Sequence, residues 1–295
     1  MVIIMFDVRS CRLCPRQCGA DRSTGAGFCG ATDKIKIARA GLHFWEEPCI
    51  SGKNGSGTVF FSGCTMKCAY CQNYEISHEN FGKTVTAQRL AEIFNELQEK
   101  GAHNINLVTP THYLPWIAEA LEIAKPKIPV VYNCGGYENR ETIREYGKYF
   151  DIFLTDIKYY SEELSAKYSK APDYFKFALE SAKEMAEITG EPVFEDGIMK
   201  KGTIIRHLVL PGHRQDSIEV LRHIDIPKEK FILSLMSQFT PKGEAEKIGL
   251  GRRITSFEYN SVVDEALSLG FDTGYMQEKS SANEEFIPPF DLTGV

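Results

Sequence analysis

No apolar run in this sequence of 295 residues approaches the ~18 residues that a membrane-spanning helix needs. The apolar start, residues 2–6, is too short for the core of a secretory signal and is followed at once by Asp7. The chain also lacks a low-complexity tract and an internal repeat of about 20–50 residues. We therefore expect a cytoplasmic protein with no membrane partner.

Positive charge is not in excess either. The 34 Lys and Arg residues face 40 Asp and Glu residues, which gives a net charge of −6. This balance argues against a nucleic-acid partner held by bulk charge, although a local basic patch is still compatible with it. Hydrophobic residues make up 43% and charged residues 25%, as in ordinary globular proteins, so disorder is excluded as the dominant state.

Cysteine is plentiful and clustered. Thiols stay reduced in the cytoplasm, so clustered cysteines there favour metal binding over disulfides. Seven of the nine fall in two groups, Cys11, Cys14, Cys18 and Cys29, and then Cys64, Cys68 and Cys71. Cys49 and Cys134 stand alone and are expected to be packed thiols.

Short apolar runs alternate with helical patterns after residue 57. The runs lie at residues 58–61, 104–108, 130–132, 152–157, 204–210 and 231–235. Thr86 is a candidate N-cap of the first intervening helix. The alternation predicts an α/β fold with a parallel sheet, either doubly wound or curled as a barrel. Ligands then belong at the carboxyl ends of the strands.

The three cysteines at positions 64, 68 and 71 follow the first of these strands. Three thiolates in one loop can hold a [4Fe–4S] cluster, which normally takes four, and leave one iron open for chemistry. A structural zinc is the rival, and it needs a fourth ligand such as His78. Three packed thiols without metal are the remaining alternative.

The spacing Cys64-x3-Cys68-x2-Cys71, with Tyr70 before the third cysteine, resembles the signature of radical S-adenosylmethionine (SAM) enzymes. The resemblance implies a partial (β/α)6 barrel, SAM bound at the open iron, and a 5′-deoxyadenosyl radical that abstracts hydrogen from a substrate. It also implies a reductant such as ferredoxin or flavodoxin. Tyr70 is expected to pack near the adenine or to cover the cluster.

Several segments resemble one branch of this superfamily more specifically, an uncharacterised branch related to pyruvate-formate-lyase-activating enzymes. These segments are residues 45–52, 71–77 and 206–213, together with the N-terminal cysteines. That kinship implies a glycyl radical enzyme as partner, while radical modification of a small metabolite or of RNA stays open. A non-catalytic iron–sulfur electron carrier is the alternative of another class, but it would not need a barrel of this size. We expect a metal-binding segment at 1–50, the radical SAM barrel at 51–275 and a tail at 276–295.

The resemblance also points to residues that hold SAM. The second strand of such enzymes usually ends in Gly-Gly-Glu, whereas this chain has Thr109 and Thr111 there, whose oxygens could accept from an ammonium group. The adjacent His112 is either a proton donor, a ligand or simply the start of a helix.

Charged residues end two later strands. Asp156 and Lys158 share one face of an otherwise apolar strand, which favours either a cofactor and cation site, as the resemblance implies, or a plain ion pair. Arg206 could clamp a carboxylate or pair with Asp156 or Glu75. Asn133 is a further candidate of this ring.

The first cysteine group supplies a complete set of four thiolates. A closed zinc site fits this count, and a second [4Fe–4S] cluster fits it equally well. The segment around the four cysteines has little apolar material, so a metal would be needed to hold it.

Overall fold

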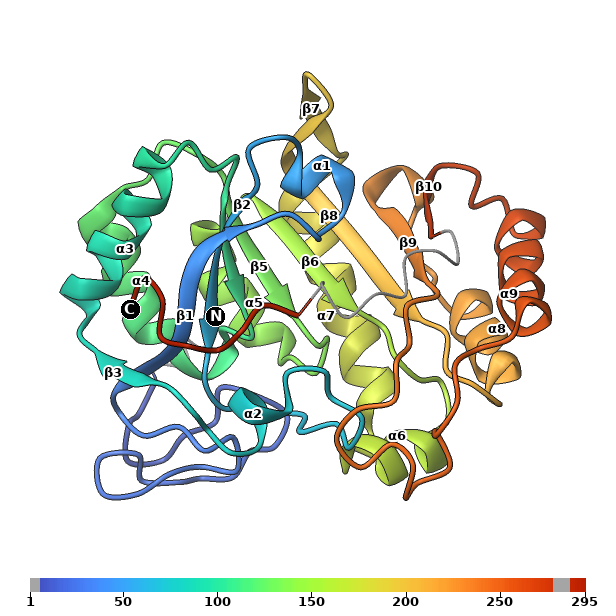
Figure 1. Ribbon diagram of the computed structural model, residues 1–295, viewed down its shortest axis with the longest axis horizontal. Helices are drawn as coiled ribbons and strands as arrows, with labels where there is room; N and C mark the ends of the chain where they lie inside the picture. The colour runs from blue at the N-terminus through green and yellow to red at the C-terminus, as the bar shows by residue number, and fades with distance from the viewer. Residues whose placement is uncertain (1–5, 278–286) are drawn as a thin grey trace.

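The computed structural model describes residues 6–277 and 287–295, and its centre is a curved parallel sheet (Figure 1). Within those residues the strand order is β10-β9-β8-β6-β5-β4-β2-β1-β3. The parallel strands are β2 (Ser56–Phe61), β4 (Ile105–Val108), β5 (Val130–Cys134), β6 (Ile152–Asp156), β8 (Ile198–Leu208), β9 (Ile232–Met236) and β10 (Gly274–Met276). All six expected strands are present, and the α/β partial barrel is confirmed.

Helices cover the outer face of this sheet. They are α3 (Ala87–Glu99), α4 (Leu114–Ala124), α5 (Arg140–Tyr146), α7 (Tyr174–Thr189), α8 (Arg214–Arg222) and α9 (Ser256–Ser268). The apolar residues of α3 and α4 pack on β2 and β4 in one core cluster, and those of α7 to α9 pack around β8 and β9 in another. The predicted cap is confirmed, because Thr86 Oγ1 accepts from the Arg89 N–H at 3.1 Å.

Two antiparallel strands that we did not expect extend the sheet at one edge. β1 (Ile35–His43) pairs with β2, and β3 (Lys83–Val85) pairs with the start of β1. The C-terminal tail continues this edge, since Ala40 N–H donates to Thr293 O and Leu292 N–H to Ala38 O. The sheet thus begins at Ile35, within the segment of residues 1–50, and the boundary expected at residue 50 stays a prediction.

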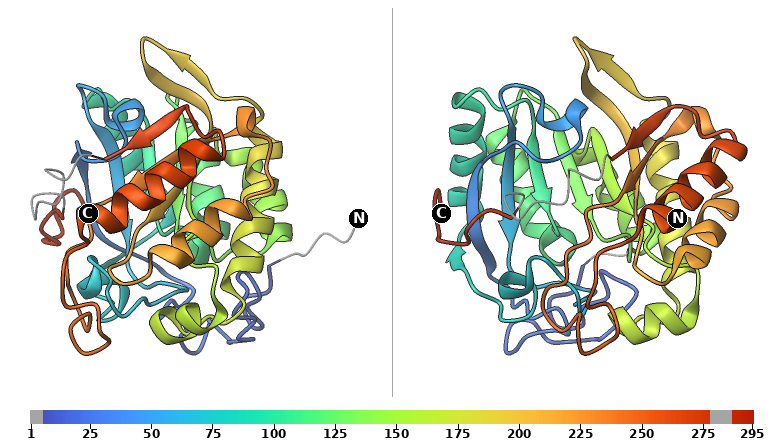
Figure 2. Two further views of the ribbon diagram at one scale, coloured as in Figure 1. Left: turned by 90° about the vertical axis from the view of Figure 1, so that its right-hand side faces the viewer. Right: turned by 45° about the vertical axis from the view of Figure 1, so that its right-hand side comes forward.

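The loops before β1 lie at the carboxyl ends of the strands. They sit beside α2 (Tyr74–Ser77) and near α6 (Glu162–Ser169), whereas β7 (Val193–Glu195) and the start of β8 project from the opposite end (Figures 1 and 2). The short α1 (Pro48–Ser51) lies on that opposite side as well. None of the helices within residues 6–277 and 287–295 is long and apolar enough to cross a membrane.

Candidate active site

A cavity of about 240 Å³ opens at the carboxyl ends of β5, β6 and β8. The cysteine loop after β2 forms one wall, the strand ends form another, and the chain before α1 closes a third. The tail contributes Ile287 and Pro288, and its Phe290 packs against the wall residue Phe60 with ring centroids 5.6 Å apart. The predicted residues that line the cavity are Cys68, Tyr70, Cys71, Asn133, Asp156, Lys158 and Arg206.

The cysteine loop folds tightly. Cys71 N–H donates to Cys68 O at 3.0 Å, and the Met66 N–H points at Cys64 Sγ at 3.3 Å. Gly63 has a φ of +87°, and a Cβ there would lie 2.5 Å from Cys29 O, so only glycine allows this turn into the loop. All three thiols are free, and Cys68 and Cys71 face the cavity.

The donor set fits an iron–sulfur cluster with one open iron. Burial and the neighbouring thiols raise the pKa of Cys64 to about 12 and also raise that of Cys71, so ionising these sulfurs requires a bound metal. No three Cys, His, Asp or Glu side chains within residues 6–277 and 287–295 form a ready cage for a single ion.

His78, the ligand expected for a zinc alternative, is engaged elsewhere. Its ring stacks on Tyr74 with centroids 4.1 Å apart, and its Nδ1 lies 2.9 Å from Ser77 Oγ. His78 does not line the cavity that Cys68 and Cys71 face.

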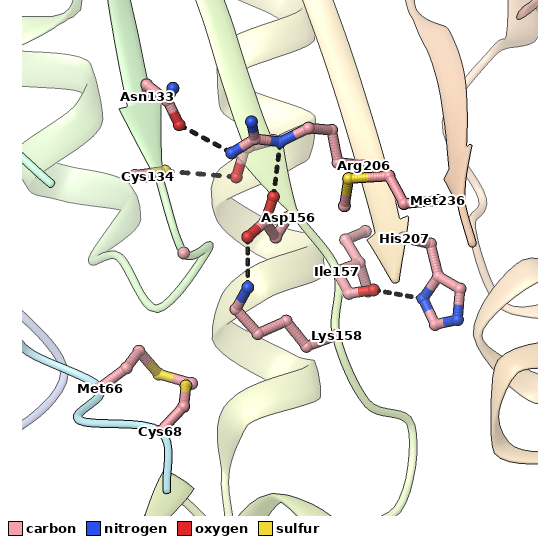
Figure 3. Close-up of polar contacts among 12 residues, drawn as sticks. Met66, Cys68, Asn133, Cys134, Asp156, Ile157, Lys158, Arg206, His207 and Met236 are labelled. Carbon is pink, nitrogen blue, oxygen red and sulfur yellow. Dashed lines mark hydrogen bonds and ion pairs between the residues drawn. The ribbon is translucent and has the colours of Figure 1, made fainter. Parts of the chain in front are cut away.

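Arg206 is the centre of the polar wall (Figure 3). Its Nε donates to Asp156 at 2.7 Å, and its two terminal nitrogens donate to Asn133 Oδ1 at 2.7 Å and to Glu46 at 3.2 Å. Lys158 Nζ pairs with the second oxygen of Asp156. The predicted Asp156–Lys158 pair and the Arg206–Asp156 partnership are thus both present, whereas no contact between Arg206 and Glu75 is found among the described residues.

The two carboxyl groups beside Arg206 differ in the direction of their pKa shifts. Burial would raise the pKa of Asp156, but Arg206 and Lys158 hold that pKa below its ordinary value. Glu46 shows the opposite outcome, because its burial raises its pKa more than Arg206 lowers it. Glu46 also accepts from the side-chain amides of Asn106 and Asn133, both at 3.1 Å. Asp156 is therefore the more firmly ionised of the two carboxyls beside Arg206.

Sequence reasoning missed Glu46 as a site residue. The segment of residues 45–52 was used only for the resemblance, and neighbouring acidic residues in a loop are usually solvated. The adjacent Glu47 is buried too, and its Oε2 has no partner among the described residues. A count of the charges at the strand ends could have found Glu46. Arg206 and Lys158 are two buried cations there, and two cations need a second carboxylate besides Asp156.

Thr109 and Thr111 do not line the cavity, and their role in holding SAM stays a prediction. Thr109 has a φ of +59° and its N–H donates to Asn133 O, so the chain turns as soon as β4 ends. Thr111 Oγ1 donates instead to Glu138 at 2.8 Å. His112 is buried, with Nε2 2.8 Å from Ser62 O, and it also stays outside this cavity.

The four N-terminal cysteines line a second, small cavity. That cavity is lined by Cys11, Cys14, Cys18 and Cys29, together with His112, whose buried Nδ1 has no partner among the described residues. The fully buried Arg22 lies 3.9 Å from Cys11 Sγ and donates to His112 O. The four thiols thus line one cavity, although no three of them form a ready metal cage among the described residues, and the second metal site stays a prediction.

The buried His207, next to Arg206 in the sequence, is expected to make the stability of the fold depend on pH. Its Nδ1 donates to Ile157 O at 2.6 Å, and its buried Nε2 has no partner among the described residues. Burial lowers the pKa of His207 to about 4 from 6.5, and the charge of Lys158 acts in the same direction, whereas the hydrogen bond to Ile157 and the charge of Asp156 oppose the shift. The folded state favours the neutral ring of His207, so this ring lowers the stability of the fold when it must be protonated. Its full contribution to the free energy of unfolding is present above pH 6.5. As the pH falls toward 4, about 3 kcal/mol of that free energy is lost.

We expect His207→Gln to flatten this acid dependence. Urea unfolding of the wild type should show a steeper loss of stability between pH 6.5 and 4.5 than unfolding of the variant. The exposed His223 provides the control, since His223→Gln should leave the dependence as steep as in the wild type. Equal pH slopes for wild type and His207→Gln would contradict the assignment.

The family comparison agrees with this geometry. The model of the radical SAM superfamily matches residues 58–224, more than half of the chain. The chain therefore belongs to the radical SAM superfamily, and it is a radical SAM enzyme. Membership brings a [4Fe–4S] cluster and SAM as cofactors and a requirement for a reductant.

Individual relatives are distant. An uncharacterized protein of Methanocaldococcus jannaschii is 28% identical over 278 residues, which are 90% of this chain and 77% of that protein. The 7-carboxy-7-deazaguanine synthase of Methanothermobacter thermautotrophicus is 28% identical over 36% of this chain and 44% of its own length. Among solved structures, SuiB of Streptococcus suis bound to SAM gives a TM-score of 0.50 at 14% identity, covering 73% of this chain and 48% of that one. This last likeness concerns the fold alone.

Proposed function

We propose that Cys64, Cys68 and Cys71 hold the cluster and that this chain reductively cleaves SAM beside it. The observation that carries the proposal is the loop of three free thiols, two of which, Cys68 and Cys71, line the 240 Å³ cavity. When bound, the cluster supplies the electron that breaks the sulfonium bond of SAM, and the 5′-deoxyadenosyl radical takes hydrogen from the substrate. A ferredoxin or flavodoxin is the proposed electron donor.

The strand-end residues bind and orient the cosubstrate in this proposal. Asp156 stays ionised and can accept from an ammonium group, while Lys158 beside it can attract a carboxylate. Arg206 has each of its three nitrogens engaged within the wall, so its role is to fix Asp156 and Asn133 rather than to clamp a ligand. The hydroxyl of Tyr70 lies 2.6 Å from that of Tyr159, and Tyr70 lines the cavity together with Cys68 and Cys71, which would place it near the cluster.

For the substrate we propose a glycyl radical partner enzyme, by the resemblance of residues 45–52, 71–77 and 206–213 to activating enzymes. A specific observation favours a second candidate, a small metabolite. Ile287 and Pro288 of the tail line the cavity and leave little room for a large partner loop. The match to 7-carboxy-7-deazaguanine synthase points in the same direction over about a third of the chain.

Anaerobically reconstituted protein with dithionite and SAM should release 5′-deoxyadenosine at a rate above that of the cluster-free protein. Chromatography of the quenched mixture measures this product. A sample with four irons per cluster and no product would overturn the proposed function. Anaerobic pull-down, followed by EPR of any partner for a glycyl radical, then separates the activating enzyme from the small-molecule enzyme.

We further propose that Cys11, Cys14, Cys18 and Cys29 hold a second metal centre, in the segment that precedes β1. The four thiols share one cavity, and burial raises the pKa of Cys14 and Cys29, so that a metal is again needed to ionise them. In a variant with Cys64, Cys68 and Cys71 all changed to alanine, metal analysis should find either about one zinc or about four irons per chain. A variant purified without either metal would remove this part of the proposal.

A further inference from the structure

The N-terminal segment touches the cluster loop directly. Cys64 N–H donates to Cys29 O at 3.0 Å, so a backbone hydrogen bond joins the last cysteine of the first group to the first cysteine of the second. Gly63 packs against the same carbonyl closely enough that a Cβ would collide with it. The position of the cluster loop thus depends on the N-terminal segment.

Arg16 makes a second connection. It lies between Cys14 and Cys18, and its guanidinium reaches two elements at once. Nε donates to Thr65 O in the cluster loop at 2.9 Å, and Nη2 donates to Ser169 O at the end of α6 at 2.8 Å. The remaining nitrogen, Nη1, donates to Lys170 O. The last carbonyls of a helix lack partners within the helix, so a cation is well placed there.

Two aromatic rings hold the Arg16 guanidinium in place. The guanidinium carbon lies 4.2 Å from the ring centroid of Phe28 and 5.0 Å from that of Tyr137. Such cation–π contacts add to the hydrogen bonds and restrict the side chain to one position. Arg16 is therefore a fixed bridge rather than a mobile surface arginine.

Ser169 carries the connection to the cluster sulfur. Its hydroxyl donates to Cys68 Sγ at 3.0 Å and lies 2.8 Å from Tyr159 OH. A serine hydroxyl has one proton, so when that proton goes to the sulfur, Ser169 Oγ accepts from Tyr159. The same count makes Tyr159 accept from Tyr70 at 2.6 Å. A directed chain of three hydroxyls ends on a cluster ligand.

We propose that Arg16 is a positioning residue, which holds the Ser169 hydroxyl on Cys68 Sγ and so lets the N-terminal four-cysteine segment set the reduction potential of the cluster. This inference rests on the proposed function, because it requires the cluster at Cys64, Cys68 and Cys71. Hydrogen bonds to the sulfurs are one of the levers that set iron–sulfur potentials. A donor to a thiolate stabilises the more negative, reduced cluster, so its loss shifts the potential downward.

The test is an EPR-monitored redox titration of reconstituted protein. Arg16→Lys keeps the charge but cannot reach three carbonyls, and Ser169→Ala removes the hydroxyl alone. Both variants should bind a full cluster with a more negative midpoint than the wild type. Arg12→Ala, at an exposed arginine of the same segment, should leave the midpoint unchanged. In the double variant the two shifts should not add, because both changes remove one hydrogen bond.

The outcomes separate this inference from the function on which it rests. A wild-type midpoint retained by both Arg16→Lys and Ser169→Ala, with full clusters, would overturn the inference and leave SAM cleavage intact. A shift in Ser169→Ala without one in Arg16→Lys would overturn the role of Arg16. A wild-type protein that takes up no cluster would refute both the inference and the proposed function.

Discussion

Cys68→Ala is expected to abolish the cluster absorbance at the cysteine loop and to lower 5′-deoxyadenosine release by at least about 100-fold, beyond the 10–100-fold typical for an outer partner of a ligand. The reason is stoichiometric. The loop supplies three thiolates, and Cys68 both lines the cavity, as Cys71 does, and accepts a hydrogen bond from the Ser169 hydroxyl. Two thiolates leave half of a four-iron cluster without protein ligands. Absorbance, iron content and product release measure the loss together.

Cys49→Ala is the matched control for this change. Cys49 is also a buried cysteine, but it packs in a separate apolar cluster with Ile50 and Met199 and does not line the cavity. The control should keep the cluster and its product release. Cys68→Ala should also keep the metal that we propose at the N-terminal cysteines. A Cys68→Ala protein with a complete cluster and wild-type release would show that the loop is not the site.

Arg206→Met is expected to lower the free energy of unfolding of the metal-free protein by about 3–5 kcal/mol, the usual effect of removing one partner from a buried charge network. The substitution keeps much of the volume but leaves Asp156 and Glu46 facing each other without the cation. Asn133 loses a donor as well. Urea unfolding at pH 7.5 measures the difference.

Arg253→Met provides the comparison, since Arg253 is an exposed arginine away from this network. That variant should change the free energy of unfolding by less than about 0.5 kcal/mol, as surface substitutions usually do. Arg206→Lys should fall between the two, because an ammonium group cannot make the three divergent hydrogen bonds of a guanidinium. If Arg206→Met were as stable as wild type, the network would not be the organising feature of the wall.

The parallel strands could be predicted because each is a short apolar run between turns, and all six expected runs became strands. β1 could not, since Arg39 and Gly41 break the alternation that Ile35 and Ile37 begin. Its place in the sheet comes from pairing with β2, which lies about 20 residues further along the chain. The same holds for the tail, whose docking on β1 depends on backbone hydrogen bonds that no local pattern specifies.

Some residues of the candidate site could likewise be predicted from the sequence, and others could not. The strand pattern predicted that the cysteine loop, Asp156, Lys158 and Arg206 lie at one edge of the sheet, because the carboxyl ends of parallel strands share that edge; the role of these residues in a cofactor site came from the family resemblance. Glu46 could not be predicted as a site residue, because it contacts Arg206 across 160 positions of sequence. The partner of Thr111 could not be predicted, because the register of a turn decides whether a hydroxyl points into the cavity or back toward Glu138.

The central claim is that SAM docks on an iron that lacks a protein ligand. EPR of the dithionite-reduced protein, before and after addition of SAM labelled with oxygen-17 in its carboxylate, tests it most directly. The account predicts a changed spectrum and a hyperfine coupling between the label and the cluster. A fully reduced four-iron cluster with an unchanged spectrum and no coupling at saturating SAM would contradict it.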